Sequence, residues 1–343
     1  MDGTTKQVLE HHDGYSIRHP ASLTKMMTLY LVFDALQKKK ITWDTTFLVS
    51  NFATKQIPCK LWLKKGEKVS VRTLAMALIT RSANDAAVVV AEGLFGSQDA
   101  FVKKMNEKAK ELGMKRTTFY NPSGVPDSRQ ITIAYDMALL GYALKNSFPA
   151  EFKLFNTQIF HYKGQAVRNH NHLLGIAGIH GIKTGYTVAS GSNLTACATR
   201  NNRFLITVVL GAPSWHWRDQ RVKELFNKHF SKPALAGKSM FSSPYDKELE
   251  DALDSKESLD DILPLSPMDE ELEAIDEEVE AIIKPVFAEK PQVKRQALSP
   301  IKASVKQLTY HTQEGKKLPK GWTIGKPQDQ DNAVKTPEVK KKK

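Results

Sequence analysis

The chain has 343 residues, of which 41% are hydrophobic and 25% are charged, and its formal net charge is +13. This composition excludes a fibrous chain and a wholly disordered one, and no apolar run approaches the roughly 18 residues of a membrane-spanning helix. Two cysteines, Cys59 and Cys197, are too few for a disulfide framework or a four-cysteine zinc site, and we interpret both as core thiols.

Charge is unevenly distributed along the chain. Residues 246–284 contain 16 acidic and 3 basic residues, whereas residues 290–343 contain 14 basic and 4 acidic ones. Such a switch between blocks of opposite charge marks a boundary, and prolines recur on its C-terminal side. We therefore predict a globular domain over residues 1–232, followed by an acidic and then basic linker or tail over residues 233–343 that is largely disordered.

The remaining charge makes the first part of the chain strongly basic. It contains no helix-turn-helix, RNA-recognition or zinc-finger signature, so a nucleic-acid partner is not expected. A basic surface also fits an anionic polymer or lipid surface of a cell envelope. Apolar residues over 272–282 recur at helical spacing, and the polar face of the helix that they predict is acidic. An acidic face does not favour an anionic membrane surface, so the tail gives no support for a membrane anchor and leaves membrane association open.

Helix signals dominate the first half of the chain after one weak strand signal. The helix that begins at Leu23 is apolar on all sides, which is typical of a buried helix, and Gly113 ends an amphipathic one. The predicted elements are a strand over Thr5–His11, a helix over Leu23–Leu36, two helices over Val71–Ala91 that are broken around Arg81–Asn84, and helices over Ala100–Leu112 and Ile133–Leu144.

Strand signals dominate the second half. The sequence Arg200-Asn201-Asn202-Arg203 predicts a tight hairpin turn between the last two strands, which makes them antiparallel. The fold class is therefore mixed α/β. The predicted elements are strands over Gln158–Tyr162, Ile179–Thr184, Asn193–Thr199 and Phe204–Leu210, and a closing helix over Arg218–Phe230.

Three short motifs occur in a fixed order. They are Ser22-Leu23-Thr24-Lys25, Ser82-Ala83-Asn84 and Lys183-Thr184-Gly185. Each motif alone is weak evidence for a function. The S-x-x-K pattern, for example, occurs a second time at Ser299–Lys302, in the proline-rich tail. Their structural contexts make the set specific: the first opens a helix, the second lies in the helical block and the third lies on a strand. These are the three elements of penicillin-recognising serine enzymes.

The first motif has the spacing of a nucleophile and its base. Residues i and i+3 of a helix share a face, so Lys25 can reach the hydroxyl of Ser22. Lysine acts as a base only when it is neutral, which requires burial or a nearby positive charge such as Lys183. The position of Ser22 at a helix N-terminus also places its backbone N–H near a developing oxyanion.

The other two motifs supply groups that bind substrate and move protons. The hydroxyl of Ser82 can relay a proton to a leaving amine, and the amide of Asn84 can bind the substrate backbone or the lysine. Lys183 and Thr184 offer a cation and a hydroxyl to a substrate carboxylate. Gly185 is expected to let the substrate approach the strand, which can also pair with an extended peptide.

The flanks of these motifs resemble one known family. The matching segments are His19–Thr28, Arg81–Ala87, Asn121–Gly124 and Gly181–Thr187, within a resemblance that covers about residues 4–230. The chain is similar to low-molecular-mass penicillin-binding proteins that are serine-type D-alanyl-D-alanine carboxypeptidases. The resemblance implies a β-lactamase/transpeptidase-like fold, with an antiparallel sheet flanked by helices and a helical subdomain.

The resemblance also implies an activity. The expected reaction removes the terminal D-alanine from a peptidoglycan stem peptide through an acyl-enzyme, and β-lactams are expected to acylate the same serine. No metal or other cofactor is implied. The implied roles are nucleophile for Ser22, base for Lys25, proton relay for Ser82, substrate positioning for Asn84, carboxylate binding for Lys183 and Thr184, and an oxyanion hole from the N–H groups of Ser22 and Tyr186.

Three alternatives use the same motifs. A D,D-endopeptidase needs the same residues, and an inactive envelope-binding protein has the same fold. A class A β-lactamase uses a glutamate for deacylation, but the corresponding stretch Thr117–Ser128 has only Asp127. Family members are exported to the periplasm or cell envelope. Because no apolar signal segment follows Met1, we expect a truncated start and an incomplete first strand.

Overall fold

The computed structural model describes residues 1–232, and the predicted tail over residues 233–343 lies outside these described residues. The helices are η1 (Ala21–Thr24), α1 (Lys25–Gln37), α2 (Asn51–Thr54), α3 (Val71–Thr80), α4 (Asn84–Phe95), α5 (Gln98–Glu111), α6 (Ala134–Ser147), α7 (Pro149–Phe152), η2 (Lys153–Asn156) and α8 (Trp215–Phe230). The strands are β1 (Thr46–Leu48), β2 (Lys68–Ser70), β3 (Ile159–Tyr162), β4 (Gln165–Arg168), β5 (Ile179–Thr187), β6 (Gly191–Arg200) and β7 (Arg203–Ala212).

Strands β5, β6 and β7 form an antiparallel sheet in that order. The register places Lys183 opposite Thr195, and Arg200 opposite Arg203 at the β6–β7 turn. The two residues between, Asn201 and Asn202, have φ angles of 49° and 61°. Asparagine tolerates this left-handed region, which a two-residue hairpin turn requires, so the hairpin prediction is confirmed.

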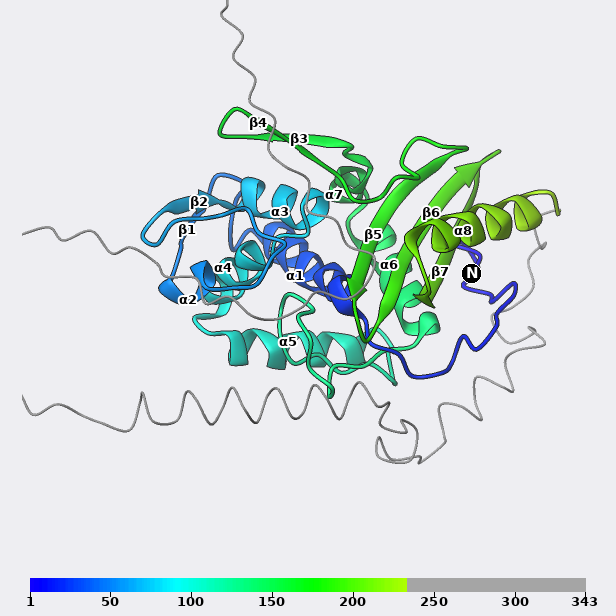
Figure 1. The fold of residues 1–343 in the computed structure, drawn as a ribbon, viewed down its shortest axis with the longest axis horizontal. Helices are drawn as coiled ribbons and strands as arrows, with labels where there is room; N and C mark the ends of the chain where they lie inside the picture. The colour runs from blue at the N-terminus through cyan, green and yellow to red at the C-terminus, as the bar shows by residue number, and fades with distance from the viewer. Residues whose placement is uncertain (233–343) are drawn as a thin grey trace, which may run out of the picture. The chain divides into compact units, whose positions relative to one another are not determined.

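Helices cover both faces of this sheet, as Figure 1 shows for α6 behind it and α8 in front. Successive strand residues point to opposite faces, and the two apolar clusters divide accordingly. Ile206 belongs to the cluster shared with the helical subdomain, whereas its neighbour Leu205 belongs to the cluster under α8. Val222 and Phe226 of α8 are fully buried there. The predicted helix-flanked antiparallel sheet is confirmed.

The helical subdomain is built around α1, which runs between it and the sheet (Figure 1). Ten of the 13 residues of α1 are buried, in agreement with its all-round apolar sequence. Helices α3 and α4 are separated by three residues around Ser82, whose φ of 58° breaks the helical path. The prediction of two helices with a break at this point is therefore confirmed.

The predicted strand over Thr5–His11 is wrong. Residues 2–7 fold into a turn because the Asp2 carboxylate accepts hydrogen bonds from the N–H groups of Thr4 and Thr5, at 3.0 and 3.3 Å. The chain pairs with β7 before this turn, where Asp2 forms an isolated bridge opposite Leu205 and the N–H of Gly3 donates to the carbonyl of Phe204 at 2.8 Å. A cavity of about 670 Å³ lies between residues 8–15, β7 and α8.

Three further features refine the expectations. The α-helix begins at Lys25, and Ser22 lies in the preceding 3₁₀ turn η1 rather than in the helix itself. Cys197 is buried as predicted, but the prediction for Cys59 is wrong, since it is half-buried in the loop before β2. Within residues 1–232, no helix combines the length and apolar character needed to cross a membrane.

Candidate active site

The site is centred on the amine of Lys25, which is fully buried in the first turn of α1. Its Nζ lies 3.0 Å from Oγ of Ser22. The 3₁₀ turn η1 has three residues per turn, so it places Ser22 directly above Lys25. The first motif therefore brings a hydroxyl and a buried amine into hydrogen-bond contact.

Two carbonyl oxygens hold the other side of this amine. Lys25 Nζ donates to Oδ1 of Asn84 at 2.7 Å and to the backbone carbonyl of Ser123. The amide of Asn84 is oriented by its own Nδ2, which donates to the carbonyl of Ile57 at 2.9 Å. A neutral amine has two N–H groups and one lone pair. With both N–H groups bound to oxygens that only accept, the lone pair faces the O–H of Ser22.

Burial and charge favour this neutral form. Burial lowers the pKa of Lys25 well below its usual value of 10.5, and the nearby charge of Lys183 lowers it further. Burial also lowers the pKa of Lys183, to about 7, and Arg218 adds to this effect. Asp85 partly opposes the shift at Lys25. The predicted requirement for a lysine with a depressed pKa is thus met by burial first and by Lys183 second.

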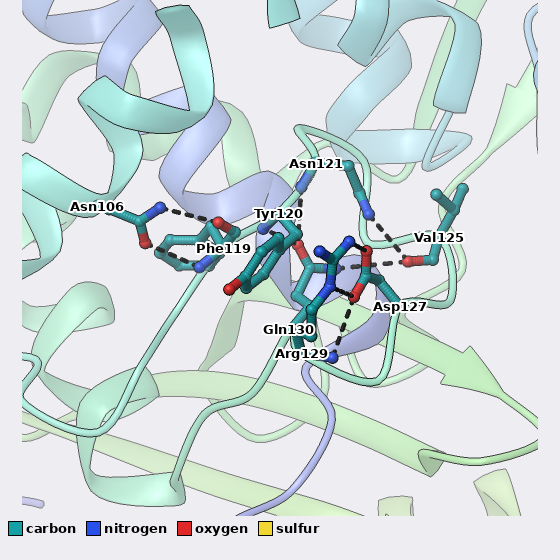
Figure 2. A network of polar contacts seen from close by, with 8 residues as sticks. All are labelled: Asn106, Phe119, Tyr120, Asn121, Val125, Asp127, Arg129 and Gln130. Atoms are coloured by element: carbon teal, nitrogen blue, oxygen red, sulfur yellow. Dashed lines mark hydrogen bonds and ion pairs between the residues drawn. The ribbon is translucent and has the colours of Figure 1, made fainter. Parts of the chain in front are cut away.

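The loop that carries Ser123 is fixed by two amide side chains, shown in Figure 2. Oδ1 of Asn121 accepts from the N–H groups of Ser123 and Gly124, at 3.2 and 2.7 Å. Oε1 of Gln130 accepts from the N–H groups of Tyr120 and Asn121. These bonds hold the Ser123 carbonyl against Lys25, a contact that residue types alone do not reveal.

Asp127 lies in the same loop but does not face the amine. Its carboxylate forms a two-point ion pair with Arg129, with Oδ1 3.0 Å from Nε and Oδ2 2.8 Å from Nη2 (Figure 2). This pairing lowers the pKa of Asp127. A carboxylate engaged in this way is a poor candidate for a base that activates water, which agrees with the absence of a deacylating glutamate.

Strand β5 is held tightly against η1. A Cβ atom at Gly185 would lie 3.0 Å from the carbonyl oxygen of Pro20 and 3.1 Å from the N of Ser22. The space in the Cβ direction of Gly185 is therefore filled by the backbone of η1, and the expectation that substrate approaches the strand backbone here stays a prediction. The absent side chain of Gly185 lets β5 approach the nucleophile, next to Tyr186.

The remaining predicted residues differ in exposure: Lys183, Thr184 and Tyr186 lie on β5, and Ser82 lies between α3 and α4. Lys183 is 1% exposed and donates from Nζ to the carbonyl of Thr184 at 2.9 Å. Tyr186 is 66% exposed at the rim. The side chain of Ser82 is buried, and its Oγ has no hydrogen-bond partner within residues 1–232. Its predicted relay role stays a prediction.

Sequence reasoning did not foresee the backbone groups that complete the site. The carbonyl of Ser123 binds Lys25, and the carbonyl of Pro122 accepts from the hydroxyl of Thr28 at 2.6 Å. The only signal for this loop was its resemblance to a family segment at Asn121–Gly124, which gave no role. Within the described residues, no group of three His, Cys, Asp or Glu side chains could hold a metal ion.

A helix-flanked antiparallel sheet with a Ser-x-x-Lys pair in hydrogen-bond contact beside it is the arrangement expected of a serine enzyme that uses a lysine as base. The model of the D-alanyl-D-alanine carboxypeptidase family, Peptidase_S11, matches residues 1–214. The chain belongs to this family.

Curated relatives carry the same family name. The chain is 35% identical to the D-alanyl-D-alanine carboxypeptidase DacF of Bacillus subtilis over 236 residues, which covers 67% of this chain and 61% of the relative. It is 37% identical to DacD of Escherichia coli K12 over 233 residues, covering 66% and 60%. It is 30% identical to a D-alanyl-D-alanine endopeptidase of Haemophilus influenzae, covering 74% and 87%. The chain thus spans about three fifths of the two carboxypeptidases.

Solved structures show the same fold. Penicillin-binding protein 5 of Haemophilus influenzae matches with a TM-score of 0.66 and 34% identity, over 67% of this chain and 69% of that one. Penicillin-binding protein D2 of Listeria monocytogenes, in its ampicillin-bound form, matches with a TM-score of 0.62 and 30% identity, over 67% and 94%. These similarities confirm the predicted β-lactamase/transpeptidase-like fold.

Proposed function

We propose that this chain is a serine D-alanyl-D-alanine carboxypeptidase that removes the terminal D-alanine from peptidoglycan stem pentapeptides. One observation carries the proposal: Lys25 Nζ lies 3.0 Å from Ser22 Oγ, while Asn84 and the Ser123 carbonyl take its N–H groups. This arrangement activates a serine at neutral pH without a histidine.

In the first step, Ser22 Oγ attacks the carbonyl carbon of the penultimate D-alanine and its proton passes to Lys25 Nζ. In this proposal the N–H groups of Ser22 and Tyr186 stabilise the oxyanion, which the close approach of β5 to η1 at Gly185 supports. The C–N bond then breaks, the proton reaches the leaving nitrogen with Ser82 as its relay, and D-alanine departs. An ester on Ser22 remains.

In the second step, water attacks the ester carbonyl and gives a proton to Lys25. The ester C–O bond breaks, the proton returns to Ser22 Oγ, and the shortened peptide leaves as a carboxylic acid. Lys183 and Thr184 are proposed to hold the terminal carboxylate of the substrate. No metal or other cofactor takes part in this scheme.

The same site is proposed to react with β-lactams. A β-lactam amide presents a carbonyl to Ser22 and a carboxylate to Lys183, and the Listeria relative has been solved with ampicillin bound. With Asp127 paired to Arg129, no carboxylate of this loop is poised to hydrolyse the adduct quickly. We therefore propose a long-lived penicilloyl-enzyme rather than a β-lactamase, and a location in the periplasm or cell envelope where the peptidoglycan substrate occurs.

A D,D-endopeptidase is the second candidate. It is favoured by the endopeptidase of Haemophilus influenzae, 87% of whose length this chain matches. Both activities cleave a bond after a D-alanine, and they differ in the amine that leaves: free D-alanine or the side chain of a second stem peptide. Parallel assays on a pentapeptide monomer and on a cross-linked dimer separate the two.

The proposal is tested by intact mass after incubation with benzylpenicillin, together with D-alanine release from a pentapeptide. We expect a single stable adduct and D-alanine release, both abolished by Ser22→Ala. The second S-x-x-K pattern offers a matched control, Ser299→Ala, which should behave as the parent chain. An adduct that persists in Ser22→Ala, or rapid β-lactam hydrolysis without an adduct, would contradict the proposal.

A further inference from the structure

The backbone of Gln130 is bound to the chain that leads into η1. Its carbonyl accepts a hydrogen bond from Nδ1 of His19 at 3.1 Å. Two residues further on, Thr132 exchanges two backbone hydrogen bonds with Arg18, both at 2.8 Å. Arg18 and His19 lie just before the turn that carries Ser22, so the position of Gln130 relative to the nucleophile is fixed by the fold.

The side chain of Gln130 is buried and holds the loop that supplies an acceptor to the catalytic amine (Figure 2). Its Oε1 accepts from the N–H groups of Tyr120 and Asn121, at 3.0 and 3.2 Å. Its Nε2 lies 3.5 Å from the carbonyl oxygen of Val125. One amide therefore holds both ends of the loop, and the carbonyl of Ser123 that binds the amine lies between them.

The same loop packs closely against η1 at Gly124. Its φ angle is 81°, and a Cβ atom at this position would overlap the carbonyl oxygen of Ala21 and lie 3.0 Å from the N of Ser22. The loop thus contacts the amine of Lys25 through the carbonyl of Ser123 and contacts the turn of the nucleophile through Gly124. A displacement of the loop therefore changes the surroundings of both reacting groups at once.

We propose that Gln130 is a positioning residue that sets the geometry of Ser22 Oγ and Lys25 Nζ by joining the chain before η1 to the loop that carries Ser123. This inference rests on the proposed function. Gln130 acts through the carbonyl of Ser123 and the contact at Gly124, and not on the reacting atoms themselves. Proton transfer between two groups is sensitive to misplacement by about 1 Å, so loosening this connection slows acylation more than it weakens substrate binding.

The first test removes the acceptor while keeping the size of the side chain. Gln130→Met has no oxygen for the two N–H groups, whereas Gln130→Glu keeps one. Stopped-flow kinetics with benzylpenicillin separate the acylation rate constant from the dissociation constant of the preceding complex. We expect Gln130→Met to lower the rate constant about 10²-fold with little change in the dissociation constant, and Gln130→Glu to recover most of the rate. The matched control is Gln7→Met, a buried glutamine of the N-terminal turn whose Oε1 accepts no hydrogen bond within residues 1–232, and it should react as the parent chain does.

A pH profile separates positioning from a general loss of stability. A carbonyl that accepts from Nζ favours the ammonium form of Lys25, so withdrawing the loop carbonyl lowers the pKa of this amine. The charged groups that act on the amine from other elements stay in place, namely Lys183 of β5, Asp85 of α4 and the thiol of Cys59. The acid limb of kcat/KM for D-alanine release should therefore move to lower pH in Gln130→Met, even though the rate at neutral pH falls.

The outcomes separate this inference from the proposed function. An acylation rate of Gln130→Met within about threefold of the parent chain, an unmoved acid limb, or a Gln130→Glu variant as slow as Gln130→Met would overturn the role of Gln130 while leaving the carboxypeptidase intact. If Gln130→Met does not fold at the assay temperature, Gln130→Asn, which withdraws the amide by one methylene group, is judged by the same rate and the same acid limb. Absence of both D-alanine release and a penicillin adduct in the parent chain would overturn both proposals.

Discussion

At the scale of a single residue, Asn84 orients the buried amine of Lys25. Its Oδ1 accepts from Lys25 Nζ at 2.7 Å, and its Nδ2 is held by the carbonyl of Ile57. A neutral amide offers an acceptor without adding a negative charge. It therefore orients the lone pair of Lys25 while leaving burial free to keep its pKa low.

Replacing Asn84 with aspartate is predicted to raise the pKa of Lys25, because a carboxylate at this position favours the ammonium form. The acid limb of the pH profile of kcat/KM should move to higher pH, with a loss of about 10²-fold near pH 7 that recovers as the pH rises. Asn84→Ala is the control, since it removes the acceptor without adding charge and should lower the rate without moving the limb to higher pH. An unmoved profile in Asn84→Asp would show that Lys25 is not the base.

At the scale of elements, the site depends on how closely β5 approaches η1. A methyl group at Gly185 would meet the backbone at Pro20 and Ser22, at 3.0 and 3.1 Å, and must push the strand away. Gly185→Ala should slow acylation by benzylpenicillin on the order of 10²-fold and lower stability by about 1–3 kcal/mol.

The control for this change is Gly141→Ala on α6. Its Cβ would lie 3.0 Å from Cδ1 of Ile182, on the same strand but away from η1, and at an ordinary contact distance of 3.6 Å from Cγ2 of Ile206 and of Thr195. It should cost stability while leaving acylation nearly unchanged, as measured by thermal unfolding and stopped-flow kinetics. Equal losses of acylation in both variants would indicate a general disturbance of the strand rather than a specific displacement from Ser22.

Elements with strong local signals were predictable from the sequence. The β6–β7 turn followed from Asn201-Asn202, which adopt the positive φ angles that such a turn needs, and the buried helix α1 followed from its continuous apolar run. The segment Thr5–His11 was not predictable in this way. The weak alternation of apolar and polar residues in this segment does not produce a strand. The carboxylate of Asp2 accepts hydrogen bonds from nearby N–H groups, and these bonds favour a turn.

The same distinction applies to the site. Side chains at fixed spacing, such as Ser22 and Lys25, could be paired from helix geometry alone. The carbonyl of Ser123 could not, because every residue has a backbone carbonyl and this one reaches Lys25 from 98 positions away. The contact exists only because Asn121 fixes its loop, so the partner of the base is a property of the tertiary fold.

At the scale of the whole molecule, one buried carboxyl links helix α6 to the chain that precedes it. Asp136 is fully buried, and its Oδ2 accepts from the N–H of Arg116 at 3.0 Å and from the hydroxyl of Thr117 at 2.7 Å. Its other oxygen, Oδ1, has no partner within residues 1–232. Burial therefore raises the pKa of Asp136 to about 6, and the two hydrogen bonds offset only part of this effect.

This raised pKa predicts how stability changes with pH. The folded state binds the proton of Asp136 more tightly than the unfolded state, whose pKa is near 3.8, so this group makes stability fall as the pH rises from about 4 to 6. The loss is on the order of 3 kcal/mol and is complete above pH 6. Asp136→Asn retains an acceptor for Arg116 and Thr117 but does not titrate. The free energy of unfolding of this variant in urea, relative to that of the parent chain, should therefore increase between pH 4 and 7. A difference between the two that stays constant over this range would show that Asp136 is ionised at no cost in the folded state.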